Sequence, residues 1–113
     1  MADFAPIFSV LSAILRKHSK GMSIKTDSPG NLYIERSMPD SRGKPRFFGA
    51  VQEKKSYVSF HLMPVYEHPE MLKEVPEALL KRMQGKSCFN FKSIDELTLS
   101  QLDKLTAKAA KTN

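Results

Sequence analysis

The sequence predicts an α+β domain, in which a five-stranded, mainly antiparallel sheet packs on helices formed by the two ends of the chain. Two observations predict this class. Apolar residues recur at helical spacing near each end, whereas stretches between them alternate apolar and polar residues with the period of a β-strand. The chain has 113 residues, of which 41% are hydrophobic. We therefore expect one domain with one core, spanning residues 1–113.

Residues 4–18 predict the first helix. Asp3 can cap its N-terminus, Pro6 lies in the first turn, where proline is tolerated, and Gly21 follows its end. An apolar stripe of this kind packs against a core far more often than against a membrane surface. The stripe comprises Phe4, Ile7, Phe8, Leu11, Ile14, Leu15 and His18.

Residues 22–26 and 32–36 alternate and are separated by the turn sequence Asp-Ser-Pro-Gly, which predicts a β-hairpin. Its core side would carry Met22, Ile24, Leu32 and Ile34. Residues 38–45 contain two prolines and no periodicity, so they predict an exposed, mobile loop. A third strand is expected at residues 46–53.

The clearest strand signal is the segment KSYVSFHLM at residues 55–63. One side of this strand would present Val58, Phe60 and Leu62. The other side would present Tyr57, Ser59, His61 and Met63. An ordinary solvated strand would carry Lys, Glu or Thr on that side. With the three strands before it, this strand completes a predicted four-stranded antiparallel meander.

After Met63 the apolar residues return to helical spacing. Pro69 and Pro76 each stand where a short helix can begin, and the pair should end at Gly85. The apolar positions of these two helices are Met71, Leu72, Val75, Leu79, Leu80 and Met83. Residues 87–92 alternate again, with Phe89 and Phe91 on one side, and predict the fifth strand.

The final helix is predicted from Thr98, because Thr98 and Gln101 have the spacing of a capping box. Its apolar stripe comprises Leu99, Leu102, Leu105 and Ala109, and the tail at residues 108–113 should fray. Both terminal helices should pack on one sheet face. That face is predicted to carry Ile24, Ile34, Val58, Phe60, Phe89 and Phe91.

This order of elements resembles the YdhG-like family of small bacterial domains of unknown function. The resemblance is carried by Lys55-Ser56-Tyr57-Val58-Ser59-Phe60, by Pro76-x-x-Leu79-Leu80, and by Gly85-Lys86-Ser87-Cys88-Phe89-x-Phe91 with the helix that follows. It covers the C-terminal half well and the N-terminal half by pattern only. The resemblance implies a curved antiparallel sheet packed on helices. Some relatives have been described as frataxin-like iron chaperones, which gives a second hypothesis for function.

The formal net charge of +6 favours phosphate-containing partners, because basic surfaces attract polyanions. Much of this charge is spread over single lysines and the segment KAAKTN at the C-terminus, as expected for solubilising charge. Nucleic acid is therefore the third hypothesis, and no membrane partner is expected. The single Cys88 and the lack of a signal-peptide pattern predict a cytoplasmic location.

The nearest approach to a metal site is a short acidic segment with one histidine: Glu67, His68, Glu70 and Glu74. Glu70 and Glu74 would lie one helical turn apart and could share a cation, with His68 supplying nitrogen. The alternative is that Pro69 begins a helix whose dipole favours these acids without any ligand. No established ligand spacing supports a metal, and iron is implied by the resemblance alone.

Cys88 and His61 are the one pair that could act as nucleophile and base, since both should lie on the same side of the sheet. No third residue is evident to orient the histidine. A buried cysteine that packs as a small hydrophobe is the commoner case. We therefore expect no enzymatic activity.

The outward side of the predicted sheet is the candidate ligand-binding site. Mixed aromatic and polar side chains are typical of pockets and protein interfaces. The alternative is that a short helix covers this side and that its residues simply pack. The candidates are Tyr33, Glu35, Phe48, Tyr57, Ser59, His61, Met63, Cys88 and Asn90. The favoured hypothesis is a non-enzymatic module that binds a small molecule or protein there.

Overall fold

The computed structural model describes residues 4–85 and 88–111. In this part of the chain one antiparallel sheet has the strand order β1-β2-β3-β4-β6-β5. The strands are β1 (Ser23–Ser28), β2 (Asn31–Glu35), β3 (Phe47–Glu53), β4 (Val58–Leu62), β5 (Met83–Gln84) and β6 (Cys88–Phe91). The helices are α1 (Ala5–Lys17), α2 (Met63–Glu67), the 3-10 helix η1 (Pro69–Glu74), α3 (Glu77–Leu80) and α4 (Glu96–Ala110). The α+β class is confirmed, but the sheet has six strands where five were predicted.

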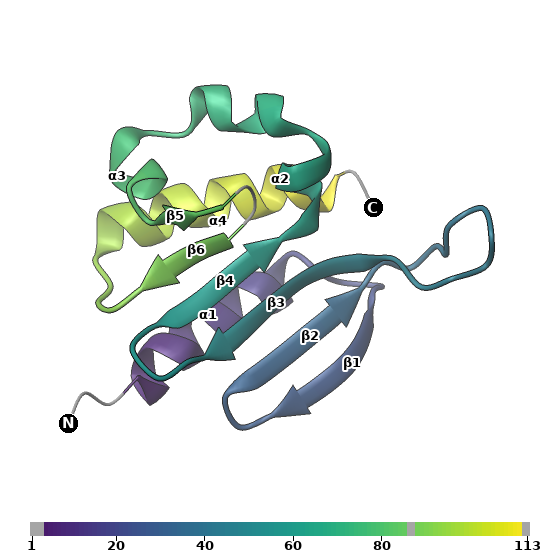
Figure 1. The fold of residues 1–113 in the computed structure, drawn as a ribbon, viewed down its shortest axis with the longest axis horizontal. Coiled ribbons are helices and arrows are strands. Elements are labelled where there is room, and N and C mark those ends of the chain that lie inside the picture. The colour runs from purple at the N-terminus through teal and green to yellow at the C-terminus, as the bar shows by residue number, and fades with distance from the viewer. Residues whose placement is uncertain (1–3, 86–87, 112–113) are drawn as a thin grey trace.

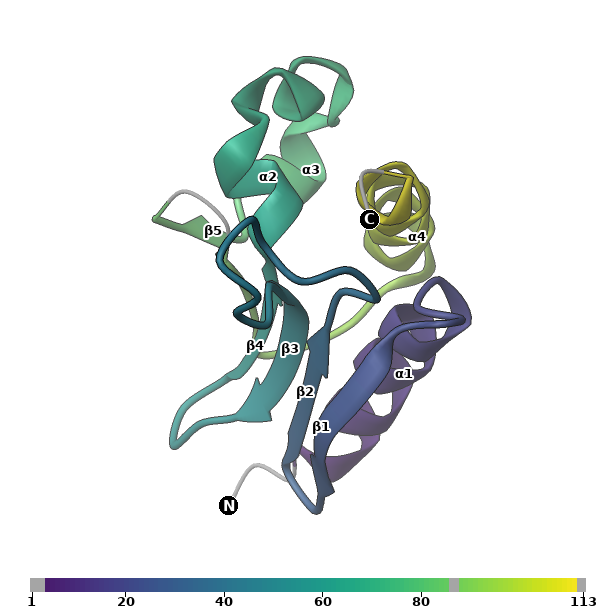
Figure 2. The same cartoon turned by 90° about the vertical axis from the view of Figure 1, so that its right-hand side faces the viewer.

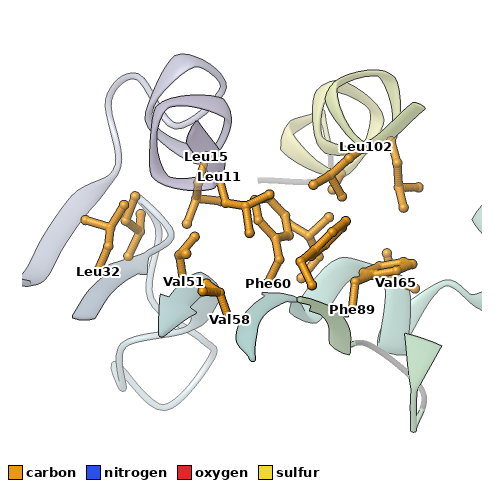
Figure 3. Packing of buried hydrophobic residues seen from close by; sticks show 14 of the residues in the cluster. Leu11, Leu15, Leu32, Val51, Val58, Phe60, Val65, Phe89 and Leu102 are labelled. Atoms are coloured by element: carbon orange, nitrogen blue, oxygen red, sulfur yellow. The ribbon is translucent and has the colours of Figure 1, made fainter. Parts of the chain in front are cut away.

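Helices α1 and α4 lie side by side on one face of the sheet (Figures 1 and 2). Between them and the strands lies the core, where Leu11 and Leu15 of α1 and Leu102 of α4 meet the apolar residues of the sheet (Figure 3). Phe60 and Phe89 are direct cross-strand partners on this face, and neither is exposed. The predicted assignment of these two phenylalanines to the core face is therefore confirmed.

Helix α1 approaches the sheet most closely at Gly49. A Cβ atom at this position would lie 2.8 Å from the carbonyl oxygen of His61 and 3.0 Å from Cδ1 of Leu15. Both distances are shorter than ordinary van der Waals contacts. A glycine in β3 therefore allows α1 to pack directly on the middle of the sheet.

Ile24 does not belong to the core, contrary to the prediction. It is paired with Ile34, which is fully buried, yet Ile24 itself is 50% exposed. The reason is its position on the edge strand β1. Helix α1 packs mainly on β3 and β4. It therefore does not cover the apolar side of the edge strand at Ile24.

The predicted hairpin is present, with Ser28 paired to Asn31 around a two-residue loop. Pro29 and Gly30 form this loop, and Gly30 has φ = +76°. Proline followed by a residue with positive φ is the arrangement of a type II turn, which explains why glycine occupies the second position. Residues 38–45 are all exposed, as predicted for this loop.

The chain between β4 and β6 differs most from the prediction. The helices expected at Pro69 and Pro76 are found as η1 and α3, but α2 precedes them and includes Met63. Pro64 lies in the first turn of α2, a position that proline favours. Met83, expected in a helix, instead forms β5 with Gln84 and pairs with β6.

Helix α4 begins three residues earlier than the predicted cap at Thr98. Asp95 is the N-cap, and its carboxylate accepts hydrogen bonds from the backbone N–H of Thr98 (2.8 Å) and from its hydroxyl. The helix continues to Ala110 with Ala109 buried, so residues 108–110 of the predicted tail belong to α4. Asp3, Lys86, Ser87 and residues 112–113 lie outside the described residues. None of the described helices has the length and apolar character needed to cross a bilayer.

Candidate ligand-binding face

One side of the sheet carries α1 and α4, and in the described part of the chain no helix lies over the opposite side (Figure 2). We call this opposite side the outward face. Cross-strand pairing and side-chain contacts define its members. They include Asn31, Tyr33, Glu35, Phe47, Ala50, Gln52, Tyr57, Ser59, His61, Cys88 and Asn90. The sequence had left open that a short helix covers this face, and no helix of the described residues does so.

Three aromatic rings form a row across β2, β3 and β4. The rings of Tyr33 and Phe47 are stacked, with centroids 4.7 Å apart and planes inclined by 23°. The ring of Phe47 also contacts that of His61, with centroids 5.3 Å apart. Ala50 is the cross-strand partner of both Tyr33 and His61 and is only 4% exposed. The ring of Phe47 therefore lies over Ala50, and the small alanine makes room for it.

Phe47, and not the predicted Phe48, is the β3 aromatic residue of the outward face. Phe48 is fully buried and belongs to the core cluster. The cause is a shift in register: Ile34 pairs with Gly49, but the next residue, Glu35, pairs with Phe47. One extra residue in a strand changes the phase of the alternation. Counting back from Ala50 by twos therefore selects the wrong member of the Phe-Phe pair.

A row of polar side chains lies beside the aromatic row. Along it, cross-strand pairs join Asn31 to Gln52, Gln52 to Ser59, and Ser59 to Asn90. The Gln52 side chain donates a hydrogen bond to the Asn31 amide oxygen at 3.3 Å, and the Ser59 hydroxyl donates to the Gln52 carbonyl at 3.4 Å. Primary amides both donate and accept hydrogen bonds. This amide row can therefore pair with donors or acceptors on the edge of a flat ligand.

At the end of the amide row, Tyr57 and Asn90 border a cavity of about 490 Å³. The other residues that line it are Lys81, Arg82, Gln84 and Lys92. Arg82 is held by Asp95 (3.6 Å) and by the carbonyl of Ser93. Among the described residues, the carboxylate that pairs with Lys81 is the exposed Glu77 at 3.9 Å, and no carboxylate pairs with Lys92. The lysine ammonium groups therefore make this end of the outward face positive.

Cys88 and His61 are direct cross-strand partners. The sequence alone could not establish that their strands are neighbours. Burial lowers the pKa of His61. Burial also raises the pKa of the Cys88 thiol, and the positive charge of Lys54 partly offsets this rise. The Cys88 thiol lies 3.5 Å from the amide oxygen of Asn90, to which it can donate. Both groups are thus neutral near pH 7. A protonated thiol is a poor nucleophile, so their geometry supports binding more than catalysis.

The four residues of the candidate metal site do not converge. Glu67 forms an ion pair with Arg36, and Glu74 forms one with Lys108. His68 and Glu70 are neighbours at 3.4 Å. Glu70 and Glu74 lie on a 3-10 helix, where residues four apart do not share a face. Among the described residues no three His, Cys, Asp or Glu side chains are placed to hold one ion.

One further candidate has another position and one is where it was predicted. Met63 is the first residue of α2 instead of the last residue of a strand. Glu35 shares the side of β2 that carries Asn31 and Tyr33 and pairs with Phe47, so it lies on the outward face, with Lys25 at 3.9 Å. The members that sequence reasoning missed are Asn31, Phe47, Ala50 and Gln52. The alternation Asn31–Tyr33 and Ala50–Gln52 was a usable signal for the two amides, whereas nothing in the sequence revealed the register shift at Phe47.

Comparison of the chain with protein-family models, with curated proteins and with solved structures finds no match. The chemistry of the outward face is therefore inferred from its own side chains: three rings in a row, an adjoining amide row and a cationic cavity.

Proposed function

We propose that the protein is a non-enzymatic binding module whose outward face holds a planar, negatively charged ligand. The observation that carries the proposal is the aromatic row beside the amide row on a sheet face that no described helix covers. Rings provide large contact area with few rotatable bonds. Amides fix the orientation of a flat ligand through its edge, and the cavity with Lys81 and Lys92 supplies positive charge for its anionic group.

We also propose that the chain is a YdhG-like domain, which the α+β arrangement of helices and antiparallel sheet supports. Iron carriage, the function described for some relatives of that family, has less support. Hard iron ions prefer carboxylate oxygens, but Glu67 and Glu74 are each paired with a cationic side chain. The binding function therefore ranks first.

The proposal is tested by titrating the 15N-labelled protein with AMP, which carries a planar ring and a phosphate, and with adenosine as the uncharged comparison. We expect amide shift changes on β2, β3, β4 and β6, with AMP binding more tightly than adenosine. Tyr57→Ala should weaken AMP binding about tenfold if the ring stacks there. Tyr66→Ala is the matched control, because Tyr66 is an exposed tyrosine on α2.

Two results would overturn the proposal. Shift changes concentrated on α4 and η1 would place the ligand in the separate cavity of about 240 Å³ that Met71, Val75, Gln101 and Leu105 help to line. No shift change on the outward face at millimolar AMP or adenosine would show that the face does not bind flat ligands.

A further inference from the structure

Resting on the proposed function, we propose that the ligand of the outward face is a single-stranded nucleic acid. Its bases would stack on the aromatic side chains of the face, and its phosphates would lie near Lys54, Lys81 and Lys92. One common RNA-binding module is an antiparallel sheet with helices on one side, and aromatic residues on its other side stack two or three bases of a single strand. This fold has that arrangement of layers (Figure 2).

The dimensions of the face suit a polymer better than a single nucleotide. Tyr33 and Phe47 lie in the same row as His61. Tyr57 immediately precedes β4, four residues before His61, which places it about 13 Å from that row at the rise of a strand. Stacking groups therefore stand on both sides of the amide row. Two bases of one strand could thus be held at once, with the amide row between them.

The positive charge of the face comes from segments that are far apart in the sequence. Lys54 follows β3, Lys81 follows α3, and Lys92 follows β6. Lys81 and Lys92 line the same cavity, and the charge of Lys54 acts on the Cys88 thiol of the outward face. Single lysines that are dispersed along the chain are therefore gathered by the fold. This charge complements the phosphates that connect successive bases.

The amide row distinguishes a single strand from a duplex. Asn and Gln side chains pair with base edges, and rings stack only on bases whose faces are free. In a duplex the base faces are covered by neighbouring pairs. Asn31, Gln52 and Asn90 lie on the broad face of a six-stranded sheet, whereas the major groove of a duplex admits a helix or a two-stranded ribbon. Binding of unpaired bases therefore uses both rows, whereas binding of a duplex would use only the lysines.

The experiment measures fluorescence anisotropy with labelled rU10, dT10 and a 10-base-pair duplex over a range of salt concentrations. We expect the single strands to bind more tightly than the duplex. With about three phosphates contacted, the slope of log K against log salt should be near −2. Lys92→Glu should weaken binding of the single strands about tenfold and make the slope shallower. Lys104→Glu, the same charge change on α4 across the sheet, should leave affinity within about twofold. The ratio of rU10 to dT10 affinity distinguishes RNA from single-stranded DNA.

Phe47→Ala tests the stacking contribution separately from charge, and Phe47→Leu preserves the fold if the alanine variant is unstable. We expect both to weaken rU10 or dT10 binding with an unchanged salt slope. Equal affinity for duplex and single strand, or equal weakening by Lys92→Glu and Lys104→Glu, would overturn the inference and indicate general charge attraction. If AMP shifts amide signals of the outward face but no oligonucleotide binds, this inference is overturned and the proposed function stands. Loss of both would overturn the proposed function as well.

Discussion

Phe60 and Tyr57 belong to one short segment but lie on opposite faces of the sheet. Phe60 is fully buried beneath α1 and α4, whereas Tyr57 borders the open cavity. Phe60→Ala should lower the free energy of unfolding by about 3–5 kcal/mol, because it leaves a large cavity in the core. Tyr57→Ala should shift the melting temperature by only a few degrees. Thermal melts of both variants measure the difference: a much lower melting temperature for Phe60→Ala than for Tyr57→Ala is expected. Equal melting temperatures for the two variants would mean that both faces of the sheet are core.

Glu67 was a candidate metal ligand, and the structure gives it a different partner. The Arg36 side chain, with which it pairs, is only 3% exposed. Glu67→Gln should lower the free energy of unfolding by about 1–3 kcal/mol, because it removes the charge that compensates a buried guanidinium. Glu70→Gln is the control, since Glu70 is exposed and its ion-pair partner among the described residues is His68 at 3.4 Å; we expect almost no effect. Urea unfolding of the two variants measures the difference, and equal effects would contradict a structural role for Glu67.

At the scale of single residues, the sequence predicted the core side better than the outward side. The fully buried apolar residues alternate along β4 and β6, so Val58, Phe60 and Phe91 could be assigned correctly, although Ser59 between the first two is also buried. The period fails wherever an extra residue enters a strand. Phe47 and Phe48 exchange roles for this reason, and no property of two identical side chains could have revealed it.

Among the elements, α4 depends on a cap that titrates. Hydrogen bonds from the backbone N–H and hydroxyl of Thr98 lower the pKa of Asp95 below its usual value, with burial acting against them and the charge of Arg82 in support. A lowered folded pKa means that the carboxylate stabilises the folded state above the ordinary aspartate pKa of about 3.9. This stability is lost as the pH falls through the folded pKa.

Asp95→Ala should therefore lower the melting temperature by several degrees at pH 7, because the Thr98 N–H loses its partner. The difference from the parent protein should shrink as the pH falls below about 3.9. Asp95→Asn is the control, since asparagine also caps helices but does not titrate. Melting curves between pH 2 and 7 measure the effect, and a loss in Asp95→Ala that does not change with pH would contradict the assignment.

The elements that the sequence missed are the short ones. Helix α2 has five residues and β5 has two, too few for a period to be recognised. Pro64 was the available signal for α2, because it stands in the first turn of the helix. For β5 no local signal exists. Met83 and Gln84 are a strand because they pair with Phe89 and Cys88, a contact that depends on tertiary structure.

For the molecule as a whole, sequence reasoning predicted the layers but not the charge distribution. The amphipathic terminal helices and the alternating strands were sufficient to place both helices on one sheet face. The positions of Lys81 and Lys92 relative to each other depend on the path of the chain through α3, β5 and β6. From the sequence, the dispersed lysines were attributed first to solubility, with nucleic acid as the third hypothesis for function, and the cationic cavity emerges only from the fold.

The two borders of the sheet determine how the outward face is presented to solution. An unpaired edge strand can recruit an edge strand of another chain and grow into an aggregate. Here β1 has a register irregularity between Ile24 and Thr26, with Lys25 at that point, and β5 at the other border has only two residues. Interrupted, charged and very short edges all resist such pairing. Each copy of the chain can therefore expose an aromatic surface without its sheet being extended by a neighbour.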